Sequence, residues 1–385
     1  MAWEGGGREA PPYLDWTLYE RPNMKLKKTL WAILLCPCCG IVAQIGTAGT
    51  FQWGVNGHCF SQEAYWQVPV ATQLDLVSEL GATWYRFDLS FEGFVSNTER
   101  MDGLLSAAEQ RKLRLLPVLC ADPGPRAEEA TTEQIRKAAF TFARQVASRY
   151  KGRITHWELD NELDAYAMIR KGERCRSGRL WEWDDAEGSN PDDFNEARYQ
   201  KTKAEILGLH EGVKAGDPDA LTIVDTSGWL HYGFIERLVK EDRVPFDILA
   251  WHWYSECGEI TNVQGRLNLV EYLKRFNKPL WITEANRRDG SKHGHEQEQA
   301  DYVGRTARQL SANPGITAFF IYELLDEPYF GTGGESDYGL VSVARDSAGA
   351  WQVSRKKPAF NAFKSAIETP ASKGDRPTSP KRPSP

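Results

Sequence analysis

The stretch "ITHWELDNE", residues 154–162, begins with apolar residues and carries three acids among its last five positions. Its β-branched and aromatic residues are typical of a strand buried inside a sheet. A buried carboxylate without a partner costs free energy, so acids at the end of a core strand need a physical reason. In a closed barrel of parallel strands, functional side chains gather where the strands end. The stretch therefore predicts a core strand that ends at a functional edge.

The same plan of a short apolar strand, a loop and an amphipathic helix repeats along the chain. We expect eight strands, at 51–57, 82–90, 113–120, 154–161, 221–227, 246–254, 279–285 and 316–323. Helical patterns lie between them, and the one at 131–152 begins with a capping box of Thr131 and Gln134. Alternating strands and helices indicate a parallel sheet with right-handed crossovers.

Eight such units predict the α/β class and a single-domain (β/α)8 TIM barrel over residues 49–368. Residues 165–195 then form an insertion after the fourth strand, which we expect to shape a substrate cleft. A doubly wound open sheet is the main alternative fold. Such a sheet usually has a glycine-rich phosphate loop after its first strand, whereas the turn here is "GVNGHCF", residues 54–60.

The composition excludes several classes of protein. The net charge of −6 argues against nucleic acid as a partner, because phosphate binding needs a basic face. The sequence contains no P-loop, dinucleotide fingerprint or serine-protease motif, and it predicts no cofactor. His293, His295 and Glu296 are close in sequence, but the pattern is that of a loop entering a helix, so we predict no metal.

Residues 1–48 are typical of an N-terminal extension followed by a signal peptide that starts at Met24. Lysines precede a short apolar run at 30–42, which is too short for a comfortable membrane span. We therefore expect a secreted or periplasmic protein without a stable membrane span after processing. The alternatives are an uncleaved anchor and a lipid-modified cysteine among Cys36, Cys38 and Cys39, although Pro37 is unfavourable directly before Cys38.

The C-terminal residues 369–385 are rich in Pro, Ser and Lys and predict a disordered tail. Four cysteines lie beyond the predicted signal peptide: Cys59, Cys120, Cys175 and Cys257. Four cysteines allow three pairings, and the sequence does not choose between disulfides and free thiols.

Polar and aromatic residues gather at the ends of the predicted strands. Those that we predict to form the site are Asn56, Arg86, Asn161, Glu162, His252, Tyr254, Glu284 and Tyr322, with Trp229 in the loop after the fifth strand. Glu162 and Glu284 end the fourth and seventh strands, which lie nearly opposite each other across a barrel. Two carboxylates that flank one bond are what cleavage of a glycosidic linkage requires.

The segment "WELDNE", together with "WITEAN" on the seventh strand, resembles the glycoside hydrolases of clan A, especially families 5 and 39. The resemblance implies a (β/α)8 barrel and a retaining mechanism. It implies Glu162 as acid/base, Glu284 as nucleophile, and Asn161 as hydrogen-bond donor to the sugar 2-hydroxyl.

The resemblance extends to Arg86 on the second strand and to His252 and Tyr254 on the sixth. We expect Arg86 to orient Glu284 and Tyr254 to hydrogen-bond to it. The sequence departs from the clan at two places, because Leu163 replaces a frequent proline and Tyr322 stands where many members have tryptophan. For Asn56, Trp229 and Tyr322, substrate binding and simple packing are both open.

The other acids of the opening stretch have different predicted roles. Side chains alternate along a strand, so Glu158 points into the barrel, and we expect it to pair with Arg86. Asp160 is predicted to support the site from behind, and Asp164 to be solvated on the following loop.

These observations predict a secreted, monomeric, retaining glycoside hydrolase that cleaves a polysaccharide or oligosaccharide. Two alternatives remain: a barrel that binds polysaccharide without cutting it, and a transglycosylase that uses the same site. The sequence leaves the sugar, the linkage and the choice of endo or exo action open.

Overall fold

The computed structural model describes residues 50–331 and 334–369, in which eight parallel strands close into a barrel. The strands are β1 (Gln52–Gly57), β2 (Trp84–Ser90), β3 (Arg114–Cys120), β4 (His156–Leu159), β5 (Leu221–Val224), β6 (Ile248–His252), β7 (Leu280–Glu284) and β8 (Ala318–Ile321). Each strand pairs with the next in sequence, and β8 pairs with β1. The predicted (β/α)8 barrel is therefore confirmed, and the open sheet is excluded.

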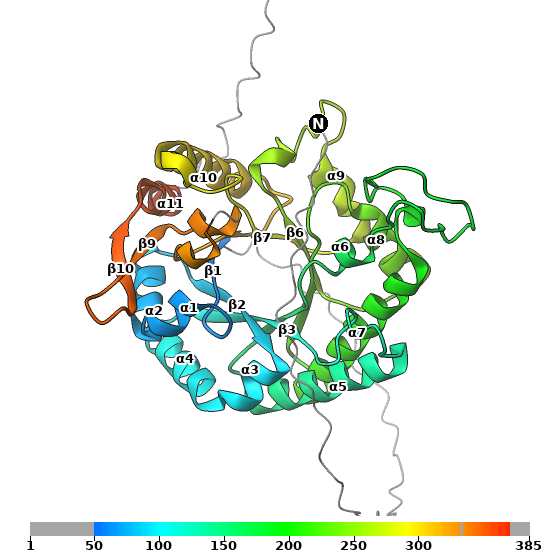
Figure 1. Cartoon of the computed structure of the whole chain (residues 1–385), viewed down its shortest axis with the longest axis horizontal. Coiled ribbons are helices and arrows are strands. Elements are labelled where there is room, and N and C mark those ends of the chain that lie inside the picture. Colours follow the sequence, from blue (N-terminus) through cyan, green and yellow to red (C-terminus); the bar gives the residue numbers. More distant parts are fainter. Residues whose placement is uncertain (1–49, 332–333, 370–385) are drawn as a thin grey trace, which may run out of the picture. The chain divides into compact units, whose positions relative to one another are not determined.

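Helices surround the barrel, as Figure 1 shows. They are α1 (Glu63–Gln67), α2 (Val70–Leu80), α3 (Phe91–Ser96), α4 (Thr98–Gln110), α5 (Thr132–Arg149), α6 (Leu163–Ala167), α7 (Glu196–Gly216), α8 (Tyr232–Glu236), α9 (Leu269–Leu273), α10 (Glu296–Ser311) and α11 (Pro358–Glu368). The predicted capping box is present at α5, where Thr131 and Gln134 satisfy each other's backbone N–H groups. Helix α2 ends at Gly81, which adopts the left-handed conformation that glycine tolerates best.

The barrel interior changes from apolar to polar along its length. At the amino ends of the strands, Trp84, Trp281 and Phe320 pack together with their rings 5.5–6.4 Å apart. Two residues further along β2, Arg86 points into the same interior, because alternate side chains of a strand share a face. The apolar layer closes one end of the barrel, and the polar side chains lie at the other.

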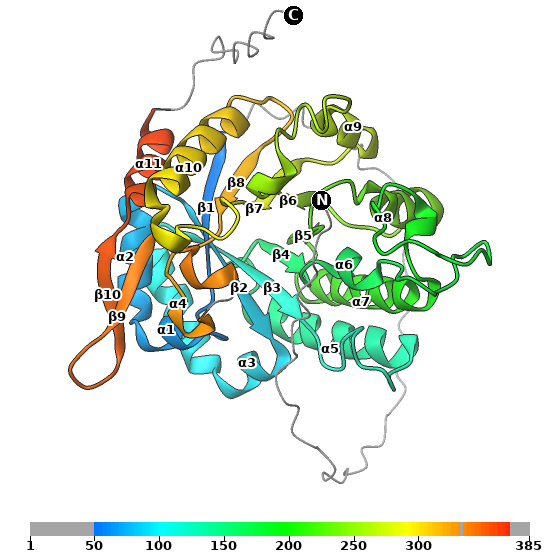
Figure 2. The same cartoon turned by 45° about the horizontal axis from the view of Figure 1, so that its top comes forward.

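A hairpin of two antiparallel strands, β9 (Val341–Arg345) and β10 (Trp351–Lys356), lies outside the barrel and was not predicted. Figure 2 shows it beside α2. Its residues are mostly half-buried or exposed, so the hairpin lacks the apolar run that marks the barrel strands.

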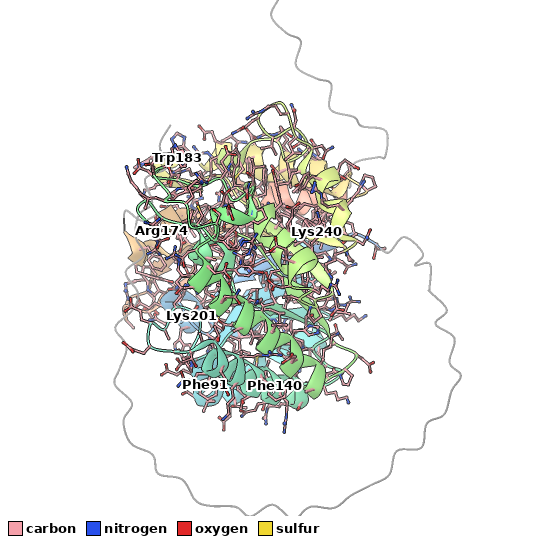
Figure 3. All side chains as sticks on the ribbon, turned by 90° about the vertical axis from the view of Figure 1, so that its right-hand side faces the viewer. Phe91, Phe140, Arg174, Trp183, Lys201 and Lys240 are labelled. Atoms are coloured by element: carbon pink, nitrogen blue, oxygen red, sulfur yellow. The ribbon has the colours of Figure 1, made fainter. Side chains whose placement is uncertain are left out.

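The segment from 160 to 195 connects β4 to α7. Arg198 at the start of α7 anchors it, since its guanidinium donates to Glu173 and to the carbonyl of Tyr166. Figure 3 faces this side of the barrel and labels Arg174 and Trp183 on the segment. Because Arg198 binds its backbone to α7, the segment packs on the barrel surface beside the end of β4.

The predicted signal peptide and tail lie outside the described residues, apart from Thr369, and so stay predictions. None of the helices in residues 50–331 and 334–369 combines the length and apolar character needed to cross a bilayer. The four cysteines in these ranges, Cys59, Cys120, Cys175 and Cys257, are all free thiols.

Helices α5 and α7 pack closely through glycines, which yields a test of the fold. A Cβ atom at Gly212 would lie 2.5 Å from the carbonyl oxygen of Phe140, whereas one at Gly103 on α4 would meet nothing within 4 Å. Gly212→Ala should lower the free energy of unfolding by about 1–3 kcal/mol through overpacking. Gly103→Ala should raise it by about 0.4–1 kcal/mol, because alanine restricts the unfolded chain. Urea unfolding of both variants measures the contrast, and equal effects would contradict this packing.

Candidate active site

Arg86, on β2, is the centre of a buried polar cluster. It is 2% exposed, and its Nε donates to Glu158 over 2.8 Å. Its Nη1 donates over 2.8 Å both to Asn56 and to Glu284, and its Nη2 donates over 2.8 Å to Asn161. The predicted pairing with Glu158 and contact with Glu284 are confirmed. Burial raises the pKa of Glu158 to about 7, and the charge of Arg86 opposes that rise.

Glu162 and Glu284 meet at the end of the barrel. One oxygen from each carboxyl and a ring nitrogen of His252 lie within 4.8 Å of one another. Two local features aim these groups: the backbone at Glu162 turns left-handed, with φ of 52°, and the β6–β7 register shifts so that His252 lies opposite Glu284. Residues from β4, β6 and β7 therefore converge on one point.

The two glutamates have different surroundings. Glu284 accepts hydrogen bonds from Arg86 and, over 2.7 Å, from the hydroxyl of Tyr254, and its side chain is 8% exposed. Glu162 lies 2.9 Å from Nδ1 of His252, and its side chain is 22% exposed. One carboxylate is thus enclosed by donors, and the other reaches solvent. The predicted bond between Tyr254 and Glu284 is confirmed.

His252 bridges the carboxylates and is fully buried. Burial by itself would lower its pKa, but the charge of Glu284 and the contacts with Asp225 and Glu162 raise the pKa well above its usual value. Its Nδ1 lies 3.5 Å from Glu284, and its Nε2 lies 3.4 Å from Asp225. A proton is therefore held on this imidazole between the acids.

Asp225, which follows β5, is a supporting residue that we did not predict for the site. Its Oδ1 accepts the backbone N–H of Glu162 over 2.9 Å, and its Oδ2 lies 3.5 Å from Arg86. The only sequence signal is that Asp225 lies near the end of the strand predicted at 221–227. Its contacts join the acid after β4 to the cation on β2.

The structure places the remaining predicted residues as follows. Asn56 is buried, and its Nδ2 donates to the carbonyls of Thr283 and Ile321 while its Oδ1 accepts from Arg86. Tyr322 is 7% exposed, and its ring lies 6.3 Å from that of Tyr254. Asn56 therefore has its amide engaged within the protein, while Tyr322 lies beside the residue that binds Glu284.

Trp229 is half-buried and packs against the core. Its backbone carbonyl accepts a hydrogen bond from the indole of Trp251 over 3.3 Å. The adjacent Gly228 has φ of 98°, and a Cβ there would lie 2.2 Å from the carbonyl oxygen of His252. The turn that carries Trp229 therefore lies directly against the end of β6.

Asp164 corrects one prediction, because it is buried instead of solvated. Its carboxylate accepts from the backbone N–H and hydroxyl of Ser227 and lies 2.5 Å from Nδ1 of His231. Helix α6 turns the side chain inward toward the loop after β5. Sequence alone shows an acid in a polar loop but not the donors that a distant loop supplies.

Asp160 forms a buried pair of carboxyls with Glu205 of α7. Burial and the charge of Asp160 raise the pKa of Glu205 well above its usual value, and burial also raises the pKa of Asp160. The raised pKa of Glu205 favours its protonated form, in which the carboxyl can donate a hydrogen bond to Asp160. Asp160 in turn accepts the backbone N–H of Asn161 over 2.6 Å, so the pair supports the turn that ends in Glu162.

Residues 183–336 match a family model described as a glycosyl hydrolase catalytic core. The matched residues are therefore similar to part of a glycosyl hydrolase core. The matched segment contains Glu284, His252 and Tyr254 and begins after Glu162. No curated protein matches the chain in sequence.

Several solved glycosidases share the fold. A family 39 glycoside hydrolase from Bacteroides cellulosilyticus WH2 is 19% identical with a TM-score of 0.58, and the match covers 83% of this chain and 63% of that one. Xylanase 10B from Thermotoga maritima is 17% identical with a TM-score of 0.58, covering 83% and 95%. A β-glucosidase from Thermotoga maritima is 13% identical with a TM-score of 0.57, covering 83% and 97%. These structures share the barrel fold, and together with the family-model match they confirm the predicted resemblance to glycoside hydrolases.

The pair of Asp160 and Glu205 predicts a pH dependence of stability. Because folding raises the pKa of Glu205, its contribution to stability is complete below the unfolded-state pKa of about 4.3 and is lost as pH rises through the folded value. Glu205→Gln keeps a donor and cannot ionise. The free energy of unfolding of the native chain should therefore fall relative to Glu205→Gln as pH rises.

Urea unfolding between pH 4 and pH 8 measures this difference. Glu211→Gln, on the same helix and with a side chain that is 38% exposed, controls for the change of residue type. A constant difference between the native chain and Glu205→Gln across this range would contradict a protonated Glu205.

Proposed function

We propose that this chain hydrolyses O-glycosidic bonds of a polysaccharide or oligosaccharide with retention of configuration. The observation that carries the proposal is the approach of Glu162 and Glu284 to within 4.8 Å through one oxygen each. Retaining glycosidases hold their two carboxyls about 5–5.5 Å apart, whereas inverting enzymes leave about 6.5–9.5 Å for a water molecule. The short approach favours direct attack by a carboxylate.

Glu284 is the nucleophile in this mechanism. The guanidinium of Arg86 and the hydroxyl of Tyr254 both donate to its carboxylate. The same two donors fix the direction of the carboxylate, so that it is oriented before substrate arrives. Attack on the anomeric carbon forms a covalent glycosyl-enzyme.

Glu162 is the acid/base. It first gives a proton to the leaving oxygen and then removes one from the water that hydrolyses the intermediate. Its side chain is exposed enough to exchange protons with solvent, and Nδ1 of His252 lies 2.9 Å away as a proton partner. The backbone bond to Asp225 holds the residue in place through both steps.

Asn161 binds the sugar beside these groups. Its Oδ1 accepts from Arg86, so the amide presents its nitrogen as the donor for the sugar 2-hydroxyl. We assign Tyr322 and Trp229 to the walls of the sugar site, where aromatic rings pack against the apolar faces of sugars.

The segment after β4 supports an extended substrate. A hollow of about 390 Å³ on it is lined by Arg179, Trp181 and Trp183, among others. The guanidinium of Arg179 lies 5.5 and 5.4 Å from the two indole rings. The aromatic rings suit the apolar faces of sugars, whereas four acids in the same lining, Asp185, Glu187, Asp192 and Asp193, disfavour a polysaccharide that carries acidic groups. With the signal peptide predicted from Met24, we propose that the protein acts outside the cytoplasm.

Substitution of the two glutamates tests the roles. Glu284→Gln should abolish release of reducing sugar, because no nucleophile remains. Glu162→Gln should slow natural substrates by about 10²–10⁴-fold and be rescued by azide with an aryl glycoside, whose leaving group needs no acid. Reducing-end assays on a panel of polysaccharides and aryl glycosides measure both effects.

Glu129→Gln is the matched control, since Glu129 is exposed on the loop before α5 and should keep full activity. Normal turnover by Glu284→Gln would contradict the mechanism. Binding of a polysaccharide by the native chain without new reducing ends would favour the binding barrel, and products longer than the substrate would favour the transglycosylase.

The stereochemistry of the product gives a separate test. Proton NMR should show that the first sugar released has the same anomeric configuration as the substrate, before mutarotation mixes the anomers. Release of the opposite anomer first would show that a water molecule attacks directly, and would overturn the assignment of Glu284 as nucleophile.

A further inference from the structure

A second group of titratable side chains lies at the ends of β1 and β8, apart from the proposed catalytic pair. One nitrogen of His58 and one oxygen each of Glu323 and Glu327 lie within 4.8 Å of one another. The ring of His58 packs 5.6 Å from that of Tyr322, which packs in turn against Tyr254. The proposed mechanism uses none of these three side chains.

His58 is oriented as metal-binding histidines are. Its Nδ1 lies 2.7 Å from the carboxylate of Asp88, which accepts the Nδ1 proton. Its Nε2 lies 3.6 Å from Oε2 of Glu323 and has no hydrogen-bond partner among the described residues. A carboxylate on one ring nitrogen fixes the tautomer and directs the lone pair of the other nitrogen toward a metal.

The two glutamates are buried without enough donors. Glu327 is 1% exposed, and neither of its carboxylate oxygens has a partner in residues 50–331 and 334–369. Glu323 is fully buried; the hydroxyl of Tyr65 donates to its Oε2 over 2.6 Å, and its Oε1 has no partner in the same ranges. Within the described chain, His58 is the only basic side chain in ion-pair distance of Glu323, and Glu327 has none. Buried carboxylates in this state need a further positive charge.

We propose that His58, Glu323 and Glu327 bind a divalent transition-metal ion of the zinc or manganese type, with Asp88 positioning the histidine. An imidazole with two carboxylates suits these ions, whereas Ca²⁺ and Mg²⁺ prefer oxygen ligands alone. Zn²⁺ lies about 2.0–2.2 Å from nitrogen and oxygen ligands, so the ligand atoms of a tetrahedral site are about 3.3–3.6 Å apart. Nε2 of His58 and Oε2 of Glu323 are already 3.6 Å apart, and the third atom, within 4.8 Å of both, needs to close by about 1.4 Å at most. The ion would supply the charge that the buried carboxylates lack.

The ion would join two distant parts of the chain. His58 follows β1, and Glu323 and Glu327 follow β8, so binding would tie the first and last strands of the barrel together beside Tyr322. Since the ion binds the folded chain alone, it raises the unfolding temperature as its concentration increases. The site is independent of Glu284, so failure of this proposal leaves the proposed hydrolysis untouched.

Metal content and thermal unfolding test the proposal. The full chain is stripped with EDTA, titrated separately with Zn²⁺, Mn²⁺, Ca²⁺ and Mg²⁺, and measured by mass spectrometry of bound metal and by unfolding temperature. We expect one equivalent of Zn²⁺ or Mn²⁺ and a rise in unfolding temperature. Glu327→Gln and His58→Gln should each lose that equivalent, and Asp88→Asn should weaken binding about 10–100-fold.

The matched control changes a histidine that contacts a carboxylate at the surface. Nδ1 of His295, directly before α10, lies 3.0 Å from Glu298, and both side chains are exposed. His295→Gln should bind metal as the native chain does. All variants keep the cysteines at 36, 38 and 39, so the difference between native chain and Glu327→Gln measures the proposed site alone.

Folding of each stripped variant is checked by circular dichroism. Equal metal content in the native chain and Glu327→Gln would overturn the proposal. So would a native chain that binds none of the four ions, in which case the two glutamates carry protons instead. Glu327→Gln would then be at least as stable as the native chain in EDTA.

Discussion

The buried guanidinium of Arg86 is the interaction on which the site depends. It contacts residues on three other strands, β1, β4 and β7, and residues that follow β4 and β5, and it supplies the positive charge beside Glu158 and Glu284. Removing one partner of a buried ion pair costs about 3–5 kcal/mol, because the other charge is left without compensation. The number of donors matters as well, since the three N–H groups of a lysine could not serve the four side chains that accept from Arg86. Arg86 therefore both stabilises this end of the barrel and orients the carboxylates of Glu158 and Glu284.

The proposed chemistry follows from how the other groups are arranged around that cation. Glu284 is enclosed by two donors, whereas the side chain of Glu162 is more exposed and contacts an imidazole. Two chemically identical side chains are thereby prepared for opposite tasks. Asp160 accepts the backbone N–H of Asn161 in the turn before Glu162, and Glu205 of α7 lies beside Asp160. Support for the proposed acid/base therefore extends into α7.

A barrel brings all strand ends to one face, so a second cluster can form there without disturbing the first. Tyr322 lies between the two, with its ring against both His58 and Tyr254. The apolar layer of Trp84, Trp281 and Phe320 closes the opposite end of the interior. Polar groups at the face are therefore backed by a dry core, which strengthens their electrostatic interactions.

The sequence by itself determined the barrel, the strand positions and the meeting of Glu162 with Glu284. These features depend on local periodicity and on where each apolar run ends, and both are visible in a short window of sequence. Arg86 and Tyr254 were predictable from the resemblance for the same reason. Only the tertiary structure decided which polar residues are buried and what they contact. Asp164, Asp225 and the group of His58, Glu323 and Glu327 depend on partners more than 60 residues away, and no local pattern specifies such a partner.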